Sequence, residues 1–268
     1  MPIDPKELLK HRFLELAEKS VSEGYLTFSP FLTLEEQGYL EELAYEGKAD
    51  VAHQKLGSAS YLLFGGYPDS ERKVLFTFPD YFSGTEMLKG IKEGHEISLL
   101  HIEGKKAEFA LALTHRDYLG ALMALGYKRE MIGDIVVVGK EAYAYVFTSI
   151  ASEIQKNLLS VGAMRVKVSV LAPQDIEVSP SFTERLINVA SLRLDAIIGE
   201  VYHLDRNSSK EAILHQEVSV SGVFTDQASL LLKGNERITY KGHGKFQYLG
   251  EVGTSRKGRI LAKVKIYR

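Results

Sequence analysis

The stretch that decides the fold of the last third of the chain is 193–222, RLDAIIGEVYHLDRNSSKEAILHQEVSVSG. Apolar residues recur at helical spacing in its first part, at Leu194, Ile197, Ile198 and Val201. After a turn at 204–207, a second short helix is predicted over 208–214. The alternation over 218–220 indicates a strand, and Ser221-Gly222 a turn. The stretch therefore predicts two short helices joined by a turn and followed by a small sheet.

A basic loop, KGHGKF over 241–246, follows a strand predicted over 238–240. Its glycines permit close backbone approach to a sugar-phosphate chain, while the side chains of Lys241, His243 and Lys245 neutralise that chain. The whole chain carries a formal net charge of -2, but it divides unevenly. Residues 180–268 hold 14 Lys/Arg and 9 Asp/Glu, a net of +5, and residues 1–179 hold 19 and 26, a net of -7. This asymmetry favours a polyanion partner for the basic part, and a solvated basic surface is the alternative.

Four pieces of this region, RLD, LDRNSSK, VSVSG and KGHGKF, resemble in order and spacing the αL RNA-binding domain of the ribosomal protein S-four type. The resemblance implies that 181–268 form such a domain with a basic tail. The RNA-binding residues expected from it are Arg193, Arg206, Asn207, Ser208, Lys210, Lys241, His243, Lys245, Arg256, Lys257 and Arg259. The chain departs from the family pattern at Asp205, Asn207 and Ser221, and lysines replace arginines in the basic loop, which predicts weaker contacts.

The turn before the second helix predicts a phosphate cradle, because Arg206 and Lys210 come beside exposed N-terminal amides of a helix. Asp195 is expected to cap the helix or to pair with Arg193 or Arg206, not to perform chemistry.

The central part, 86–174, shows the clearest order of elements. It predicts a strand, a helix, two strands, a helix and a strand, over 96–102, 114–125, 135–138, 142–147, 149–161 and 166–171. This β-α-β-β-α-β order is the ferredoxin-like plan of RNA-recognition motifs. Secondary RNA contacts are expected from Lys128, Arg129, Tyr143 and Tyr145. A half-buried strand and a helix-to-strand connection explain the same residues without RNA.

The first part, 1–85, is predicted to be a small α/β domain. A helix begins near Pro5 and ends at Gly24, and the spacing from Thr33 to Glu36 predicts a capping box. Short strands are predicted over 51–55, 61–64 and 74–78. The chain as a whole is therefore predicted to be an α+β multidomain protein.

Further motifs resemble the YlmH-like bacterial proteins over essentially the full length. They are Gly65-Gly66-Tyr67 with Glu71-Arg72, the run 119–130, Ile132-Gly133-Asp134-Ile135, and GTSRKGR over 253–259. The resemblance implies a non-catalytic RNA-binding protein that docks on ribosomal RNA of the large subunit, with tRNA as a further expected partner. It also implies a role in translation or in rescue of stalled ribosomes, with a link to cell division.

Several classes of protein are disfavoured. The chain has no cysteine, its eight histidines lack metal-ligand spacing, and no phosphate-binding P-loop or Rossmann pattern occurs, so no metal or cofactor is expected. No leader or membrane span is predicted, and a cytoplasmic monomer is expected. Two alternatives stay open: an RNA-modifying enzyme of the pseudouridine synthase type, whose catalytic Asp lies in an Arg-Leu-Asp context as Asp195 does, and a protein-binding scaffold in division.

Overall fold

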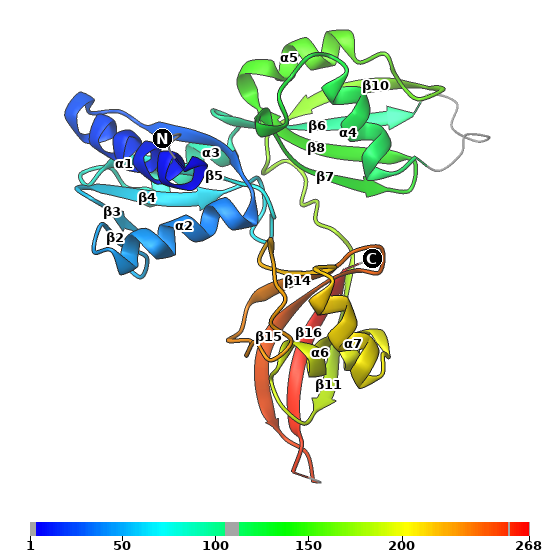
Figure 1. Ribbon diagram of the computed structural model, residues 1–268. Helices are drawn as coiled ribbons and strands as arrows, with labels where there is room; N and C mark the ends of the chain where they lie inside the picture. The colour runs from blue at the N-terminus through cyan, green and yellow to red at the C-terminus, as the bar shows by residue number, and fades with distance from the viewer. Residues whose placement is uncertain (1–3, 105–112, 257, 268) are drawn as a thin grey trace. The chain divides into compact units, whose positions relative to one another are not determined.

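The computed structural model describes residues 4–104, 113–256 and 258–267. Its contacts divide the chain into two compact units, unit 1 over 1–179 and unit 2 over 180–268. Both mix helices with antiparallel sheets, so the predicted mixed, multidomain class is confirmed (Figure 1). No helix among the described residues is long and apolar enough to cross a membrane.

The first sheet of unit 1 has the strand order β1-β5-β4-β3-β2. Its strands are β1 (Thr27–Leu32), β2 (Ala49–Asp50), β3 (Lys55–Leu56), β4 (Ala59–Phe64) and β5 (Lys73–Pro79). Helices α1 (Pro5–Glu23) and α2 (Leu34–Tyr45) pack on one face, where Phe13 and Leu43 are fully buried. Local signals place both helices: α1 ends at Gly24, whose φ of 72° suits glycine, and Thr33 and Glu36 form the predicted capping box.

The strand predicted over 51–55 is wrong. Residues 51–54 form the turn between β2 and β3, where Ala49 pairs with Leu56. The Asp50 carboxylate accepts the His53 amide at 3.2 Å, and Gln54 has a positive φ of 52°. An aspartate that holds its own turn in this way competes with extended backbone.

The second sheet of unit 1 has the strand order β7-β8-β6-β10-β9. Its strands are β6 (Ile97–Gly104), β7 (Ile132–Val138), β8 (Glu141–Phe147), β9 (Ser160–Val161) and β10 (Met164–Leu171). Helix α4 (His115–Met123) lies between β6 and β7 in the chain, and α5 (Thr148–Asn157) follows β8. The main elements thus run β6-α4-β7-β8-α5-β10, the order read from the sequence. A further helix, α3 (Gly84–Lys92), precedes them and was not predicted.

The two sheets of unit 1 share a hydrophobic core. Strand β5 alternates, so Leu75 packs under α1 and α2 while Phe76 and Phe78 face the larger core. Phe147, on β8, lies 4.9 Å from Phe31 of β1, measured between ring centroids. Residues 1–85 and 86–174 were predicted as separate domains; that division stays a prediction, and the two parts are packed together within unit 1.

Unit 2 is a six-stranded antiparallel sheet in the order β11-β16-β15-β14-β12-β13. Its strands are β11 (Phe182–Val189), β12 (Val218–Val220), β13 (Val223–Phe224), β14 (Glu236–Tyr240), β15 (Gly244–Thr254) and β16 (Ile260–Tyr267). Helices α6 (Leu194–Tyr202) and α7 (Arg206–Leu214) cover one face of it (Figure 1). The end of the chain was expected to be a basic tail, but 260–267 pair with both β11 and β15 and so lie inside the sheet.

Candidate nucleic-acid interface

The start of α6 is fixed by an ion pair. Arg193 donates from Nε and a terminal nitrogen to the two oxygens of Asp195, at 3.0 and 2.8 Å. The Asp195 side chain is only 5% exposed and the Arg193 side chain is 35% exposed. Hydrogen bonds from Arg193 hold the pKa of Asp195 below its usual value against the opposing effect of burial. The expectation that Asp195 pairs with Arg193 is confirmed.

The start of α7 is capped by an acid. The Asp205 carboxylate accepts the amides of Asn207 at 2.8 Å and Ser208 at 3.0 Å, and the Ser208 hydroxyl at 2.7 Å. The Ser208 amide is the largest cause that lowers the pKa of Asp205. The predicted cradle of exposed helix amides is therefore wrong, because a carboxylate already occupies two of them. Any phosphate bound here must be held by side chains, such as the exposed Arg206.

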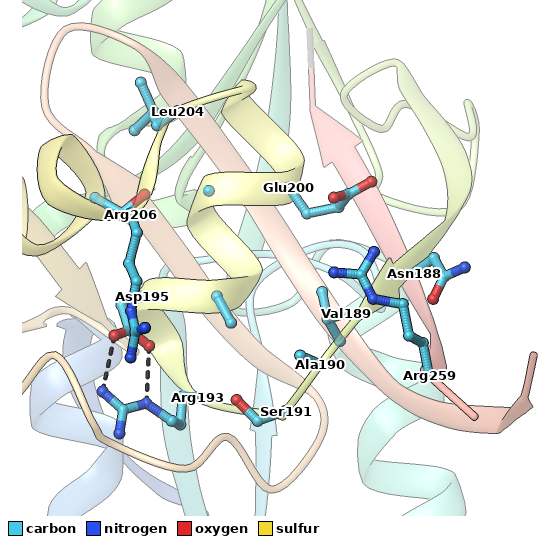
Figure 2. A pocket seen from close by; sticks show the side chains of 13 residues that line it. Asn188, Val189, Ala190, Ser191, Arg193, Asp195, Glu200, Leu204, Arg206 and Arg259 are labelled. Carbon is cyan, nitrogen blue, oxygen red and sulfur yellow. Dashed lines mark hydrogen bonds and ion pairs between the residues drawn. The ribbon is translucent and has the colours of Figure 1, made fainter. Parts of the chain in front are cut away.

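A cavity of about 400 Å³ opens beside these two helix starts (Figure 2). Three arginines line it from three different parts of unit 2. Arg193 precedes α6, Arg206 begins α7, and Arg259 belongs to the β15–β16 connection. In Figure 2 the side chains of Arg206 and Arg259 lie on opposite sides of the α6 backbone. Arg193 and Arg206, which the αL pattern predicted, thus line the same cavity as Arg259, which lies 53 residues after Arg206 in the sequence.

Of the basic loop predicted over 241–246, residues 241–243 form the tight turn between β14 and β15, and 244–246 are the first residues of β15. Gly242, with a φ of 81°, adopts a conformation that favours glycine. His243 is exposed, and its ring stacks on Tyr240 with centroids 4.1 Å apart. A Cβ added at Gly242 or Gly244 would meet nothing within 4 Å, so these glycines serve the turn and not a close approach within the protein.

Lys245 does not lie with the other predicted residues. Its neighbour Phe246 is fully buried in the core under α6 and α7, so Lys245 faces the opposite side of the sheet. There its ammonium group lies 5.6 Å from the centre of the Tyr267 ring. The predicted site residues are thus divided between two faces.

A second basic group on that opposite face was missed from the sequence. Arg237 lies 5.1 Å from the Tyr267 ring centre, and Lys265 lies 3.9 Å from that of Phe182. The alternation of Lys263, Lys265 and Tyr267 is the signal that could have located it, had the end of the chain been read as a strand.

The two arginines of the β15–β16 connection differ in position. Arg259 lines the cavity, whereas Arg256 is exposed and does not. The backbone amide of Arg259 donates to the Ser255 hydroxyl at 3.0 Å, which orders the turn. Lys257, also predicted, lies outside the described residues.

The predicted contacts of the central part have mixed outcomes. Tyr145 is fully buried, with its ring 5.5 Å from that of Tyr67 and its hydroxyl donating to the Val178 carbonyl, so its predicted base stacking is wrong. Burial also raises the pKa of Tyr145. Tyr143 is partly exposed, but its ring already stacks on His101 at 4.7 Å.

The charged residues of the same region also differ from the expectation. Lys128 is exposed and lies 3.8 Å from a Glu130 oxygen. Arg129 turns inward and donates to the carbonyls of Ile132 and Gly133. Burial lowers the pKa of Arg129 to about 10, with repulsion from Arg72 as a second cause. The inward position of Arg129 is therefore explained by its hydrogen bonds within the protein, without an RNA contact.

Two of the YlmH-like motifs meet in unit 1 at Asp134. Its carboxylate is 8% exposed and accepts the Tyr67 hydroxyl at 2.7 Å and the amides of Glu71 at 2.7 Å and Arg72 at 3.0 Å. A Cβ on Gly66, beside Tyr67, would lie 2.0 Å from the Tyr145 ring. These motifs join the two sheets of unit 1.

Comparisons with known proteins agree with the resemblance read from the sequence. Residues 91–175 match the family model described as "Putative RNA-binding domain in YlmH". Over 245 residues the chain is 26% identical to the ribosome-associated protein quality control protein P2 of Bacillus subtilis (strain 168), covering 90% of this chain and 88% of that protein. The chain resembles the YlmH proteins. A solved YlmH structure, the cell division protein from Streptococcus pneumoniae, is 19% identical, with a TM-score of 0.46, and covers 64% of this chain and 94% of that one.

The YlmH resemblance predicted from the motifs is thus confirmed, and the names of these relatives describe RNA-binding and ribosome-associated proteins, not enzymes. The assignment of unit 2 to the αL family stays a prediction. No group of three or more potential metal ligands occurs among the described residues.

Proposed function

We propose that this protein binds RNA through the helix-bearing side of unit 2 and works without catalysis on the ribosome. The surface that carries the proposal is the arginine cavity together with Lys210 and the turn residues Lys241 and His243. We call this set the arginine face. We further propose that unit 2 is an αL domain and that the RNA is ribosomal RNA of the large subunit, with tRNA as a second contact.

The observation that carries the proposal is the convergence of Arg193, Arg206 and Arg259 on one cavity. Guanidinium groups bind phosphate oxygens through two parallel N–H donors, which suits a sugar-phosphate chain. Lys210 adds to this field and is close enough to contribute to the lowered pKa of Asp195, after the larger effect of Arg193. Structured RNA is recognised largely by shape and backbone, so such a surface needs no code of base contacts.

The central sheet is a weaker surface for RNA, although the family model describes its region as RNA-binding. Two aromatic positions on the face away from α4 and α5 are covered, because Tyr145 packs on Tyr67 and Phe147 on Phe31. The remaining part carries Glu141, whose carboxylate pairs with His101 at 2.8 Å. This carboxylate lies beside the partly exposed ring of Tyr143 and repels phosphate there.

The proposed place in the cell follows from the Bacillus subtilis relative, whose name is that of a ribosome-associated quality control protein. We therefore propose a role in translation when ribosomes stall. The predicted link to cell division stays a prediction.

The first test is a ribosome pelleting assay over a salt series. If about six phosphates are engaged, a plot of log affinity against log salt concentration should have a slope of about -4 to -5. A flat response would contradict the electrostatic mechanism and favour the protein-binding scaffold.

The second test compares three double variants with the same change of charge. Arg206→Glu with Lys210→Glu reverses the arginine face and should weaken ribosome binding by at least about a hundredfold at low salt. Arg12→Glu with Lys19→Glu, on α1, should leave binding nearly unchanged. None of these four side chains is buried, so melting temperatures should change little.

The third variant, Arg165→Glu with Lys167→Glu, reverses two exposed charges on β10 of the central sheet. If this variant loses more binding than the one on the arginine face, the RNA-binding surface lies in unit 1 and the assignment to unit 2 is wrong. Mass mapping of ribosomal RNA from a deletion strain tests the enzyme alternative, which predicts one missing modification.

A further inference from the structure

The turn between β14 and β15 holds a stack of two rings. The amide of His243 donates to the carbonyl of Tyr240 at 3.0 Å, so residues 240–243 form a β-turn. Gly242 is the third residue of this turn, and its φ of 81° is a conformation that glycine adopts readily at that position. The turn brings its first and last residues together, and their rings lie on one another. The local sequence therefore builds the stack.

The stack is close to parallel and is supported by the core of unit 2. The rings of His243 and Tyr240 have centroids 4.1 Å apart and planes inclined by 14°. Tyr240 is only 8% exposed. Tyr202, at the end of α6, meets the Tyr240 ring edge-on with centroids 5.4 Å apart. Because the ring below it is held in place, the orientation of the His243 ring is fixed by packing.

The outer face of the His243 ring is accessible. The residue is exposed, and Tyr240 covers only one side of the ring. Aromatic side chains, histidine included, bind RNA by stacking on its unpaired bases. A flat ring with one supported face and one open face is suited to that contact. Neutralisation of a phosphate requires no such arrangement, because a flexible lysine achieves it as well.

Cationic groups accompany this ring on the arginine face. Lys241, two residues before His243, is exposed. The Tyr202 ring lies 6.5 Å from that of His243, measured between centroids, and Tyr202 precedes Arg206 by four residues, a span of at most about 14 Å between their Cα atoms. A base on His243 and phosphates held by Lys241 and Arg206 can therefore belong to one RNA.

We propose that His243 binds RNA by stacking: the base of one unpaired nucleotide lies on the open face of its ring and extends the stack of His243 on Tyr240. This inference rests on the proposed RNA-binding function and assigns His243 a role other than charge neutralisation. Stacking requires a flat π-system and no particular donor or acceptor. The contact therefore selects an unpaired base over a missing one, without reading which base it is.

The test uses the full-length protein and two RNA hairpins that differ at one bulged nucleotide. One hairpin carries adenosine in the bulge and the other an abasic ribose, so both present the same phosphates. Since stacking of one base is worth roughly a five- to hundredfold change in affinity, the wild type should bind the adenosine hairpin about tenfold more tightly, as fluorescence anisotropy measures. Equal affinity for both hairpins would overturn the inference.

Two replacements of His243 separate stacking from charge. His243→Phe keeps a ring and should retain the tenfold preference, whereas His243→Lys keeps a basic group without a ring and should bind both hairpins equally. Lysine is a better replacement than alanine, because its aliphatic stem can cover Tyr240 and keep that ring from stacking on the base instead. If the preference survives in His243→Lys, or is lost in a folded His243→Phe, the base does not stack on His243.

His215 provides the matched control. It is exposed at the end of α7 in the same unit. His215→Lys makes the same chemical change as His243→Lys, but it should leave the preference for the adenosine hairpin intact. Equal loss in the two lysine variants would mean that the preference does not depend on the stacked ring.

A fluorescent base gives a direct readout of the stack. The chain has no tryptophan, so the emission of 2-aminopurine placed in the bulge can be followed with little contribution from the protein. The wild type and His243→Phe should quench this emission on binding, and His243→Lys should not. Unchanged emission in a hairpin that the wild type binds would contradict the inference.

Ribosome pelleting separates this inference from the proposed function. His243→Phe should pellet with ribosomes as the wild type does, whereas His243→Lys should bind about five- to tenfold more weakly at the same salt concentration. If the wild type binds ribosomes and His243→Lys binds them at least as tightly, the stacking inference fails and the proposed function stands. If the wild type does not bind ribosomes, the proposed function itself fails.

Discussion

Two arginines of unit 1 and two of unit 2 lie in opposite environments. In unit 1, Arg72 and Arg129 point inward: Arg72 donates to the Phe31 carbonyl, and Arg129 donates to two carbonyls of β7. In unit 2, Arg206 and Arg259 line an open cavity and have no ion pair among the described residues.

The difference shows why a count of basic residues does not locate a polyanion site. Burial lowers the pKa of both Arg72 and Arg129, because a guanidinium removed from water is stabilised less as a cation. The N–H groups of such an arginine donate to backbone carbonyls, so the buried side chain cannot bind a phosphate. The exposed arginines keep their donors available. Accessibility, more than charge, therefore separates the structural arginines of this chain from those that we propose to bind RNA.

The largest effect is expected at the acid that joins the two sheets of unit 1. Asp134→Ala leaves the Tyr67 hydroxyl and two amides without an acceptor and removes a negative charge that offsets two buried cations, Arg72 and Arg129, so unit 1 should lose about 3–5 kcal/mol. Urea unfolding followed by circular dichroism measures the loss. Asp117→Ala, which removes an exposed helix cap on α4, should cost only about 1 kcal/mol. Similar losses for both would mean that Asp134 does not join the sheets.

The motifs that join the two sheets of unit 1 were visible in the sequence, but the contact between them was not predicted. The capping box of Thr33 and Glu36 was predicted correctly, since it depends on residues three apart. The helix predicted over 149–161 was too long, because α5 ends at Asn157 and residues 160–161 form β9, which pairs with β10. Asp134 and Tyr67 are 67 positions apart, and no local pattern joins them. The same reason explains β11 and β16, which pair Phe182 with Tyr267 and were not predicted as strands.

The candidate site was predictable to a similar degree. The αL-like pattern indicated Arg193 and Arg206, and the structure brings both to one cavity. Lys245 was placed on the wrong face because the strand around it was not recognised, and the face of a residue depends on its register in a sheet.

The next effect compares one arginine that should matter for stability with one that should matter for RNA binding. Arg129→Met should cost unit 1 about 1–3 kcal/mol, because two carbonyls lose their donor, and should leave RNA affinity unchanged. Arg206→Met should do the reverse, with unaltered stability and RNA affinity about tenfold lower at low salt. Ribosome pelleting and thermal unfolding of both variants check this. A loss of RNA affinity in folded Arg129→Met would remove the distinction between the two arginines.

A smaller effect depends on pH and concerns the ion pair between Arg193 and Asp195 in the cavity. Pairing with Arg193 lowers the pKa of Asp195 in the folded protein, so its stabilising contribution is complete above the ordinary Asp pKa of about 3.9. The contribution is lost as the pH falls through the lower folded pKa. Asp195→Asn should therefore cost about 1–2 kcal/mol at pH 7 and progressively less below about pH 4. A difference in unfolding free energy that stays constant from pH 7 to pH 3 would contradict the ion pair.

The smallest effect tests whether an acid beside the arginine face restrains RNA binding. Asp205 caps α7 and thereby places a carboxylate next to Arg206. Serine caps helices about as well as aspartate, so Asp205→Ser should change stability by less than about 0.5 kcal/mol. Loss of one exposed negative charge should raise RNA affinity about two- to threefold at low salt, and the gain should disappear as salt screens it. Asp175→Ser removes an exposed acid from unit 1 and should leave affinity unchanged. If both variants gain equally, the effect is one of net charge, whereas a gain confined to Asp205→Ser would place the phosphates at the start of α7, where the exposed Arg206 can reach them.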